Sequence, residues 1–166
     1  MIRAEAEIDR AAVRAVNTEA FETTAEADLV DALREGAQPV VSLVAEHDGR
    51  IVGHIMFSPV TLVGEPELKI MGLAPMAVAS ARQRKGIGSA LVGAGLEQCT
   101  ALGFGAVVVL GHPTYYPRFG FIPSTRWNIH CEYEAPPEAF MAIELQEGYL
   151  AGRAGTIRYH PAFAEV

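Results

Sequence analysis

Cysteine, basic charge and long apolar runs are all scarce in this sequence. The two cysteines, Cys99 and Cys131, have the spacing of neither a disulfide framework nor a zinc site. Lys and Arg number 13 against 20 Asp and Glu, and the net charge of −7 argues against binding along a nucleic-acid backbone. The most hydrophobic stretch, residues 106–110, is too short to span a bilayer, and the first residues lack a signal-peptide pattern. The sequence therefore predicts a cytoplasmic protein with no metal site and no nucleic-acid or membrane partner.

Apolar residues, in contrast, are abundant. They make up 50% of the 166 residues, which is typical of a globular chain that buries its own core. The length fits a single domain over residues 1–166. We expect the core of this domain within about residues 1–123 and further strands within residues 124–166 that complete the sheet.

Hydrophobic periodicity and turn residues divide the chain into strands and helices. Asp48-Gly49 is a strong hairpin signal, and Gly64-Glu65-Pro66 predicts the next turn, so three neighbouring strands are expected to be antiparallel. Thr23 and Glu26 have the spacing of a capping box that opens a helix. The expected strands cover residues 2–5, 40–46, 50–63, 68–78, 106–110, 127–134, 141–145 and 156–159, and the expected helices cover 9–21, 23–36 and 86–102. The pattern predicts an α/β fold with a mixed, largely antiparallel central sheet and flanking helices.

A glycine-containing segment with three basic residues joins a predicted strand to a predicted helix. It runs Val78-Ala-Ser-Ala-Arg-Gln-Arg-Lys-Gly-Ile-Gly-Ser89. Glycines permit a tight turn that directs several amide groups to one spot, and the positive end of the helix adds to the attraction for an anion. This context favours a phosphate or diphosphate site over a merely solvated group of charges.

Two common nucleotide-binding loops do not fit this segment. A P-loop needs Gly-Lys followed by Ser or Thr, whereas Lys85 here precedes Gly86. A dinucleotide fingerprint needs glycine or alanine where this chain has Leu91, and an acidic residue after a strand that is here wholly apolar. The anion is therefore expected to belong to another kind of ligand.

Two motifs resemble those of the GNAT superfamily of N-acetyltransferases. Gln83-x-x-Gly86-x-Gly88, after a strand that ends at Val78, resembles the acyl-CoA diphosphate loop of the superfamily. Tyr115-Tyr-Pro-Arg-Phe-Gly-Phe121 resembles the Tyr-x-Lys/Arg-x-Gly-Phe pattern that follows the fifth strand in many members, and the run 107–121 is similar to one bacterial subgroup of predicted acetyltransferases. The resemblance implies a GNAT-like fold with acetyl-CoA as co-substrate. It also implies which residues bind acetyl-CoA: Met76, Ala77 and Val78 through their backbone amides, and Gln83, Arg84, Lys85, Gly86, Ile87, Gly88 and Ser89 in the loop.

The same resemblance implies that Tyr116 is the general acid that serves the CoA sulfur, although Pro117 departs from the pattern. A phenol with a pKa of about 10 stays protonated at neutral pH and can donate a proton. Tyr115 is expected to be a packing aromatic. Many relatives place a glutamate within the fourth strand, but the only carboxylate near this strand is Glu67, at its start. The candidates for the general base are therefore Glu22, Glu26 and His112, with a water-relayed proton as the alternative.

The other titratable residues are expected to have structural roles. We expect His54 on a strand surface and His160 in a structural position near the C-terminus. Cys99 falls within a predicted helix and Cys131 on an apolar strand face, so both are expected to be inert, buried thiols.

The sequence thus favours an acetyl-CoA-dependent N-acetyltransferase that acts on a small amine or an exposed amino group by direct attack in a ternary complex. Its acidic surface favours a cationic acceptor, with the acceptor site between the first helices and residues 124–166. One alternative is an acyl-CoA-binding sensor with little turnover, which the missing strand glutamate motivates. Another is a binder of a nucleotide other than CoA. A monomer and a homodimer are both compatible with the sequence.

Overall fold

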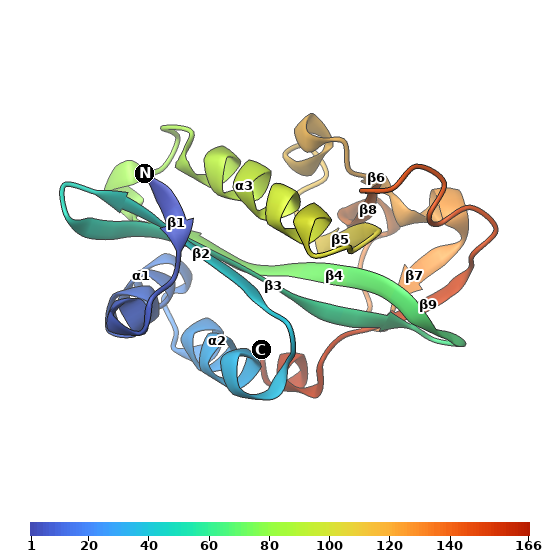
Figure 1. The fold of residues 1–166 in the computed structure, drawn as a ribbon, viewed down its shortest axis with the longest axis horizontal. Helices are drawn as coiled ribbons and strands as arrows, with labels where there is room; N and C mark the ends of the chain where they lie inside the picture. The colour runs from blue at the N-terminus through green and yellow to red at the C-terminus, as the bar shows by residue number, and fades with distance from the viewer.

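The computed structural model describes residues 1–166 and contains one sheet with helices on both faces. Figure 1 shows α3 (Ile87–Ala101) on one face, and α1 (Arg10–Phe21) and α2 (Ala25–Gly36) on the other. The strands are β1 (Ile2–Ala4), β2 (Val41–His47), β3 (Arg50–Leu62), β4 (Glu65–Val78), β5 (Ala106–Leu110), β6 (Ile122–Pro123), β7 (Ile129–Cys131), β8 (Phe140–Glu144) and β9 (Gly155–Arg158). The predicted fold class is confirmed.

The sheet has the strand order β1-β2-β3-β4-β5-β8-β6, and β9 pairs with β3 and with β7. All pairs in the main order are antiparallel except β4 with β5. Asp48 and Gly49 have φ angles of 51° and 76° and connect β2 to β3, as their sequence predicted. Pro75 falls where the register between β3 and β4 shifts, because proline cannot donate a hydrogen bond to the ladder.

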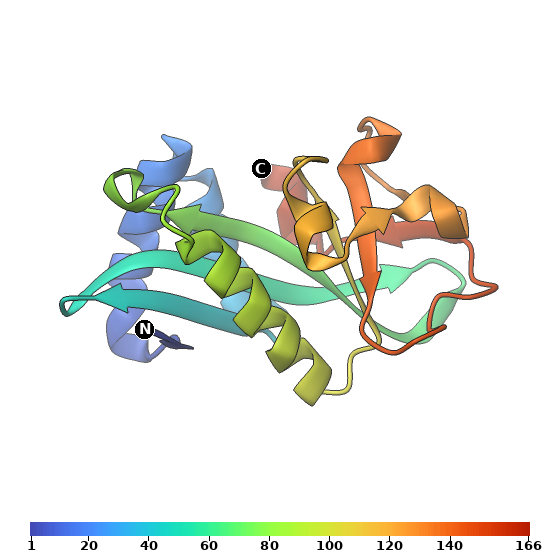
Figure 2. The same cartoon turned by 90° about the horizontal axis from the view of Figure 1, so that it is seen from above.

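Strands β4 and β5 pair over only part of their length. Their register runs from Ile70–Ala106 to Gly72–Val108 and ends there. Beyond Gly72, β4 keeps β3 as its neighbour, while β5 continues beside β8. A gap therefore opens between the C-terminal ends of β4 and β5, and the loop after β4 leads directly into α3, which crosses the strands in Figure 2.

The larger core cluster lies between α3 and the sheet and contains Phe57, Leu73, Leu91 and Val107. Helix α3 approaches the sheet closely at Gly95, where a Cβ atom would lie 2.1 Å from Cε1 of Phe57. A second cluster lies beneath α1 and α2, and a third lies beneath the C-terminal strands. Helix α3 and the sheet together hold the β4–α3 loop in place.

Two local predictions are wrong. The capping box at Thr23 and Glu26 does not form, because α2 begins at Ala25 and the Thr23 hydroxyl accepts a hydrogen bond from the Ala25 amide at 2.9 Å. The predicted strand 127–134 is much shorter, because residues 124–127 form a 3₁₀ turn and only β7 joins the sheet.

His54 is not on a strand surface, as its sequence context predicted, but is fully buried beneath α1. Its Nδ1 lies 3.1 Å from the amide nitrogen of Asn17, and its Nε2 lies 2.9 Å from the hydroxyl of Ser42. Because an amide nitrogen can only donate, Nδ1 accepts and Nε2 carries the proton. Ser42 then donates to Glu5 at 2.8 Å. The neutral imidazole thus links α1, β3, β2 and the end of β1.

This burial makes the stability of the fold depend on pH. Burial, with a smaller contribution from the charge of Arg34, lowers the pKa of His54 from 6.5 to about 3. His54 is therefore protonated below about pH 6.5 in the unfolded chain, but only below about pH 3 in the folded protein. We expect the free energy of unfolding to fall as pH decreases through this window, by up to about 1.4 kcal/mol per pH unit from this residue. Urea unfolding at pH 7.5, 6.0 and 5.0 measures the slope.

The control is His54→Gln, which keeps a donor and an acceptor but cannot be protonated. This variant is expected to be less stable than the parent at pH 7.5, and the difference is expected to narrow as the pH falls. Parallel pH profiles for the two proteins would show that His54 does not carry the effect.

Candidate active site

A cavity of about 690 Å³ lies between the loop after β4 and the segment after β5. These two walls meet there because β4 and β5 diverge beyond Gly72. Nine of the site residues predicted from the sequence line the cavity: Met76, Val78, Gln83, Arg84, Gly86, Gly88, Ser89, His112 and Tyr116. It also contains Arg82, Tyr115 and Arg118, which the sequence did not assign to the site.

Free amides line the start of α3. Gly86 precedes the helix with a φ angle of 83°, a conformation that glycine adopts without strain. The first hydrogen bond of the helix runs from the amide of Ala90 to the carbonyl of Gly86, so the amides of residues 87–89 have no partner within the helix. Such a helix end, with Arg82 and Arg84 beside it, is suited to bind phosphate groups.

The end of β4 offers two further amides to the gap. The amide of Ala79 donates to the carbonyl of Val52 in β3, and this bond shows which amides near the end of β4 point toward β3. In an antiparallel ladder the amides alternate between the two sides, so the amide of Ala77 faces β3 and those of Met76 and Val78 face the gap. The amides of Met76 and Val78 are therefore free to meet a ligand in the gap, whereas the amide of Ala77 is not.

Two side chains fasten the loop. Gln83 donates from Nε2 to the carbonyl of Val78 at 3.1 Å, which closes the loop onto the end of β4. Glu19 of α1 accepts hydrogen bonds from the amide and the hydroxyl of Ser80, at 2.7 and 2.5 Å, and these bonds lower the pKa of Glu19. The loop is therefore held by a helix on the opposite face of the sheet.

Tyr116 lies in the segment after β5 and is 8% exposed. Its ring packs edge-on against Phe121, and Gly111 leaves room for it, since a Cβ there would lie 2.5 Å from Tyr116 Cε2. Burial and the neighbouring Tyr115 raise the pKa of Tyr116 to about 12, so this phenol stays protonated throughout the neutral range. Pro117 falls within a 3₁₀ turn (Tyr116–Phe119) and does not prevent Tyr116 from facing the cavity.

Comparison with known proteins agrees with this geometry. Residues 10–121 match the model of the acetyltransferase (GNAT) family. This chain belongs to that family. Over 164 residues it is 37% identical to YhbS, an uncharacterized N-acetyltransferase of Escherichia coli K12, with 98% of each chain covered.

Two solved structures of GNAT family members match nearly the whole chain. The crystal structure of E. coli YhbS in complex with CoA matches with a TM-score of 0.93 at 37% identity, covering 99% of this chain and 91% of the other. The structure of a GNAT family acetyltransferase from Brucella melitensis in complex with acetyl-CoA matches with a TM-score of 0.80 at 37% identity, covering 98% and 97%. The predicted family and fold are confirmed.

Several residues assigned from the GNAT resemblance lie outside the cavity. Lys85 and Ile87 line a separate hollow of about 250 Å³ beside β1 and β2. Glu22 is exposed at the end of α1 and has a φ angle of 60°. Glu26 lies in the first turn of α2, and its Oε1 is buried without a hydrogen-bond partner. Cys99 is buried as expected, and burial raises its pKa to about 12, whereas Cys131 is only partly buried.

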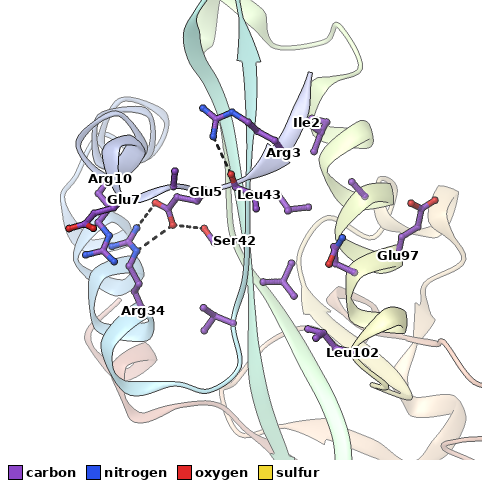
Figure 3. A pocket seen from close by; sticks show the side chains of 16 residues that line it. Ile2, Arg3, Glu5, Glu7, Arg10, Arg34, Ser42, Leu43, Glu97 and Leu102 are labelled. Atoms are coloured by element: carbon purple, nitrogen blue, oxygen red, sulfur yellow. Dashed lines mark hydrogen bonds and ion pairs between the residues drawn. The ribbon is translucent and has the colours of Figure 1, made fainter.

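A second hollow, of about 570 Å³, lies at the edge of the sheet between α2 and α3. Figure 3 shows Arg34 pointing to Glu5, and Glu5 to Ser42, across this hollow. Arg34 also pairs with Asp31, so its positive charge is already neutralised within the chain. No glycine lines this hollow, which distinguishes it from the cavity beside the glycine loop. The structure contains no cluster of three or more metal-ligating side chains, and none of its helices has the length and hydropathy of a membrane span.

Proposed function

We propose that this GNAT family member transfers the acetyl group of acetyl-CoA to an amine while both substrates are bound. The observation that carries the proposal is the cavity itself, in which the free amides of α3 and the gap between β4 and β5 open into one space. The helix end suits a diphosphate, and the gap suits an extended chain that pairs with a strand edge. The match to the CoA complex of YhbS supports the same ligand.

Acetyl transfer from a thioester requires stabilisation of the developing oxyanion and protonation of the leaving sulfur. In this proposal the amides of Met76 and Val78 stabilise the oxyanion, which is worth about 3–4 kcal/mol per donor. Tyr116 is protonated and faces the cavity, so it can donate a proton to the sulfur. This assignment is supported by the fact that Met76, Val78 and Tyr116 line the same cavity.

Among the three candidate bases, Glu26 has the strongest support. It precedes Leu29 and Val30 by one helical turn and so shares the face of α2 that packs against Val44 in the sheet. A buried carboxylate oxygen without a partner is costly unless something binds it. Glu22 and His112 are exposed, although His112 lines the cavity and the two glutamates do not. We infer that Glu26 receives the acceptor amine from the face of the sheet opposite α3.

We therefore expect Glu26→Gln to reduce turnover at neutral pH by about 10²-fold, because a general base contributes roughly 10²–10⁴-fold to rate. The rate of thiol release at saturating acetyl-CoA and amine measures the effect. Glu22→Gln removes the same charge from an exposed position and is expected to leave turnover within about two-fold of the parent. Equal turnover in the two variants would show that Glu26 is not the base and would leave His112 or a water-relayed proton in that role.

The proposed activity is tested by calorimetry with CoA and by thiol release from acetyl-CoA over a panel of amines. We expect saturable CoA binding, and thiol release that depends on at least one amine. Saturable binding with no thiol release from any amine would favour the sensor. Tighter binding of ATP or NAD than of CoA would favour a different nucleotide ligand.

A further inference from the structure

Arg118 and Tyr115 lie on the wall of the cavity that faces the glycine loop. The guanidinium of Arg118 lies over the ring of Tyr115, 4.5 Å from its centroid, and its Nε donates to the carbonyl of Tyr115 at 3.0 Å. These two contacts occupy one face and one nitrogen of the guanidinium. Arg118 is exposed, and no carboxylate pairs with it or with Arg82 and Arg84 in the same cavity, whereas four other arginines, Arg3, Arg14, Arg34 and Arg153, have acidic partners. Arg118 is thus an unneutralised cation with a fixed orientation.

Tyr115 also reaches across the cavity to α3. Its hydroxyl lies 3.2 Å from the hydroxyl of Ser89, in the first turn of α3. A Cβ at Gly88 would lie 3.2 Å from the same Tyr115 hydroxyl. The ring that supports Arg118 is therefore fastened beside the unpartnered amides of α3, and it holds the guanidinium close to the place where phosphates would bind.

We propose that Arg118 is a phosphate ligand of this cavity and that Tyr115 is the residue that positions it. The proposal rests on the proposed function, since the phosphates are those of CoA. A planar guanidinium binds phosphate through two parallel hydrogen bonds, and stacking on an aromatic ring keeps its outer nitrogens free for this contact. The sequence predicted that Tyr115 is only a packing aromatic. In this proposal Tyr115 orients Arg118, whereas Tyr116 donates a proton to the CoA sulfur.

The first test compares CoA with 3′-dephospho-CoA by calorimetry. Arg118→Gln is expected to weaken CoA binding by about ten- to a hundred-fold, as the loss of a charge-assisted contact predicts. Weaker binding of both ligands would assign Arg118 to the diphosphate, and weaker binding of CoA alone would assign it to the 3′-phosphate; either result supports the proposal. Dissociation constants within about two-fold of the parent for both ligands would overturn it.

A matched control separates local contact from overall charge. Arg126→Gln removes the same charge from an exposed position eight residues further along the chain, outside the cavity. It is expected to leave CoA binding within about two-fold. Comparable weakening in the two variants would show that general electrostatics, and not a phosphate contact, explains the effect.

The positioning role of Tyr115 has its own test. Tyr115→Phe keeps the aromatic face and is expected to weaken CoA binding by less than about three-fold, whereas Tyr115→Ala removes the face and is expected to match Arg118→Gln. In the double variant Tyr115→Ala/Arg118→Gln the two effects should not add. Full additivity, or unchanged CoA binding by Tyr115→Ala, would overturn this part of the proposal. If the parent protein does not bind CoA at all, the proposed function fails independently of these variants.

Discussion

Gly86→Glu is expected to abolish CoA binding while the protein remains folded. The new carboxylate would stand at the positive end of α3, beside the amides of residues 87–89, where it would compete for those amides and repel a diphosphate. Loss of two or three charge-assisted hydrogen bonds, at about 1.5–3 kcal/mol each, weakens binding by at least about 10²-fold. No atom lies within 4 Å of the position that a Cβ would take at Gly86, so the core is not disturbed. Calorimetry with CoA measures the loss.

Two controls isolate the charge from the backbone. Gly86→Ala imposes only the strain of a left-handed conformation, which costs about 1–2 kcal/mol, and is expected to bind CoA with a moderately raised Kd. Gly64→Glu places the same side chain at another open glycine with a φ angle of 90°, in the turn between β3 and β4, and is expected to bind CoA normally. Unchanged CoA affinity in folded Gly86→Glu would refute the assignment of the loop.

The parts of the fold that the sequence predicts well have determinants that are neighbours in the chain. Asp48 and Gly49 both take positive φ angles, and this turn follows directly from their residue types. The glycine loop is equally local, because the turn at Gly86 and the free amides after it arise within one short segment. The apolar run 106–110 forms a strand within the sheet as predicted, and its residues 106–109 are buried on both faces.

The features that sequence reasoning missed depend on residues that are far apart in the chain. His54 meets Asn17 across 37 positions, and Tyr115 meets Ser89 across 26. Neither contact leaves a signal in the local pattern, because the pattern around a residue does not show which distant element packs against it. Glu26 was placed in a capping box by its spacing, but α2 begins at Ala25, and one oxygen of this carboxylate is buried without a hydrogen-bond partner.

The position of Arg118 within a family motif was visible in the sequence, but its role was not. It belongs to the motif Tyr115–Phe121 that identified the family, yet its role could not be separated from that of an ordinary surface arginine. The deciding facts are the stacking on Tyr115 and the place of Arg118 in the wall of the cavity, and both are three-dimensional. The motif therefore predicted which segment forms this wall of the site, but not the role of each side chain in it.

The other large effect is expected from Tyr116→Phe, which should reduce turnover by about 10²–10⁴-fold if this phenol protonates the CoA sulfur. The substitution removes one oxygen and keeps the ring that packs against Tyr115 and Phe121, so the fold and the CoA dissociation constant should stay close to those of the parent. Thiol release under saturating substrates, together with CoA calorimetry on the same preparation, measures the two quantities.

A fall in turnover without a fall in CoA affinity is the decisive pattern, because a packing defect in this cavity would weaken both. The pH dependence gives an independent check. The pKa of Tyr116 is raised to about 12, so loss of its proton cannot limit the parent enzyme between pH 7 and pH 10. Any decline of turnover in that range must come from another group and should persist in Tyr116→Phe. Near-normal turnover of the variant would instead make Tyr116 a packing residue, and the proton for the sulfur would then come from water in the gap between β4 and β5.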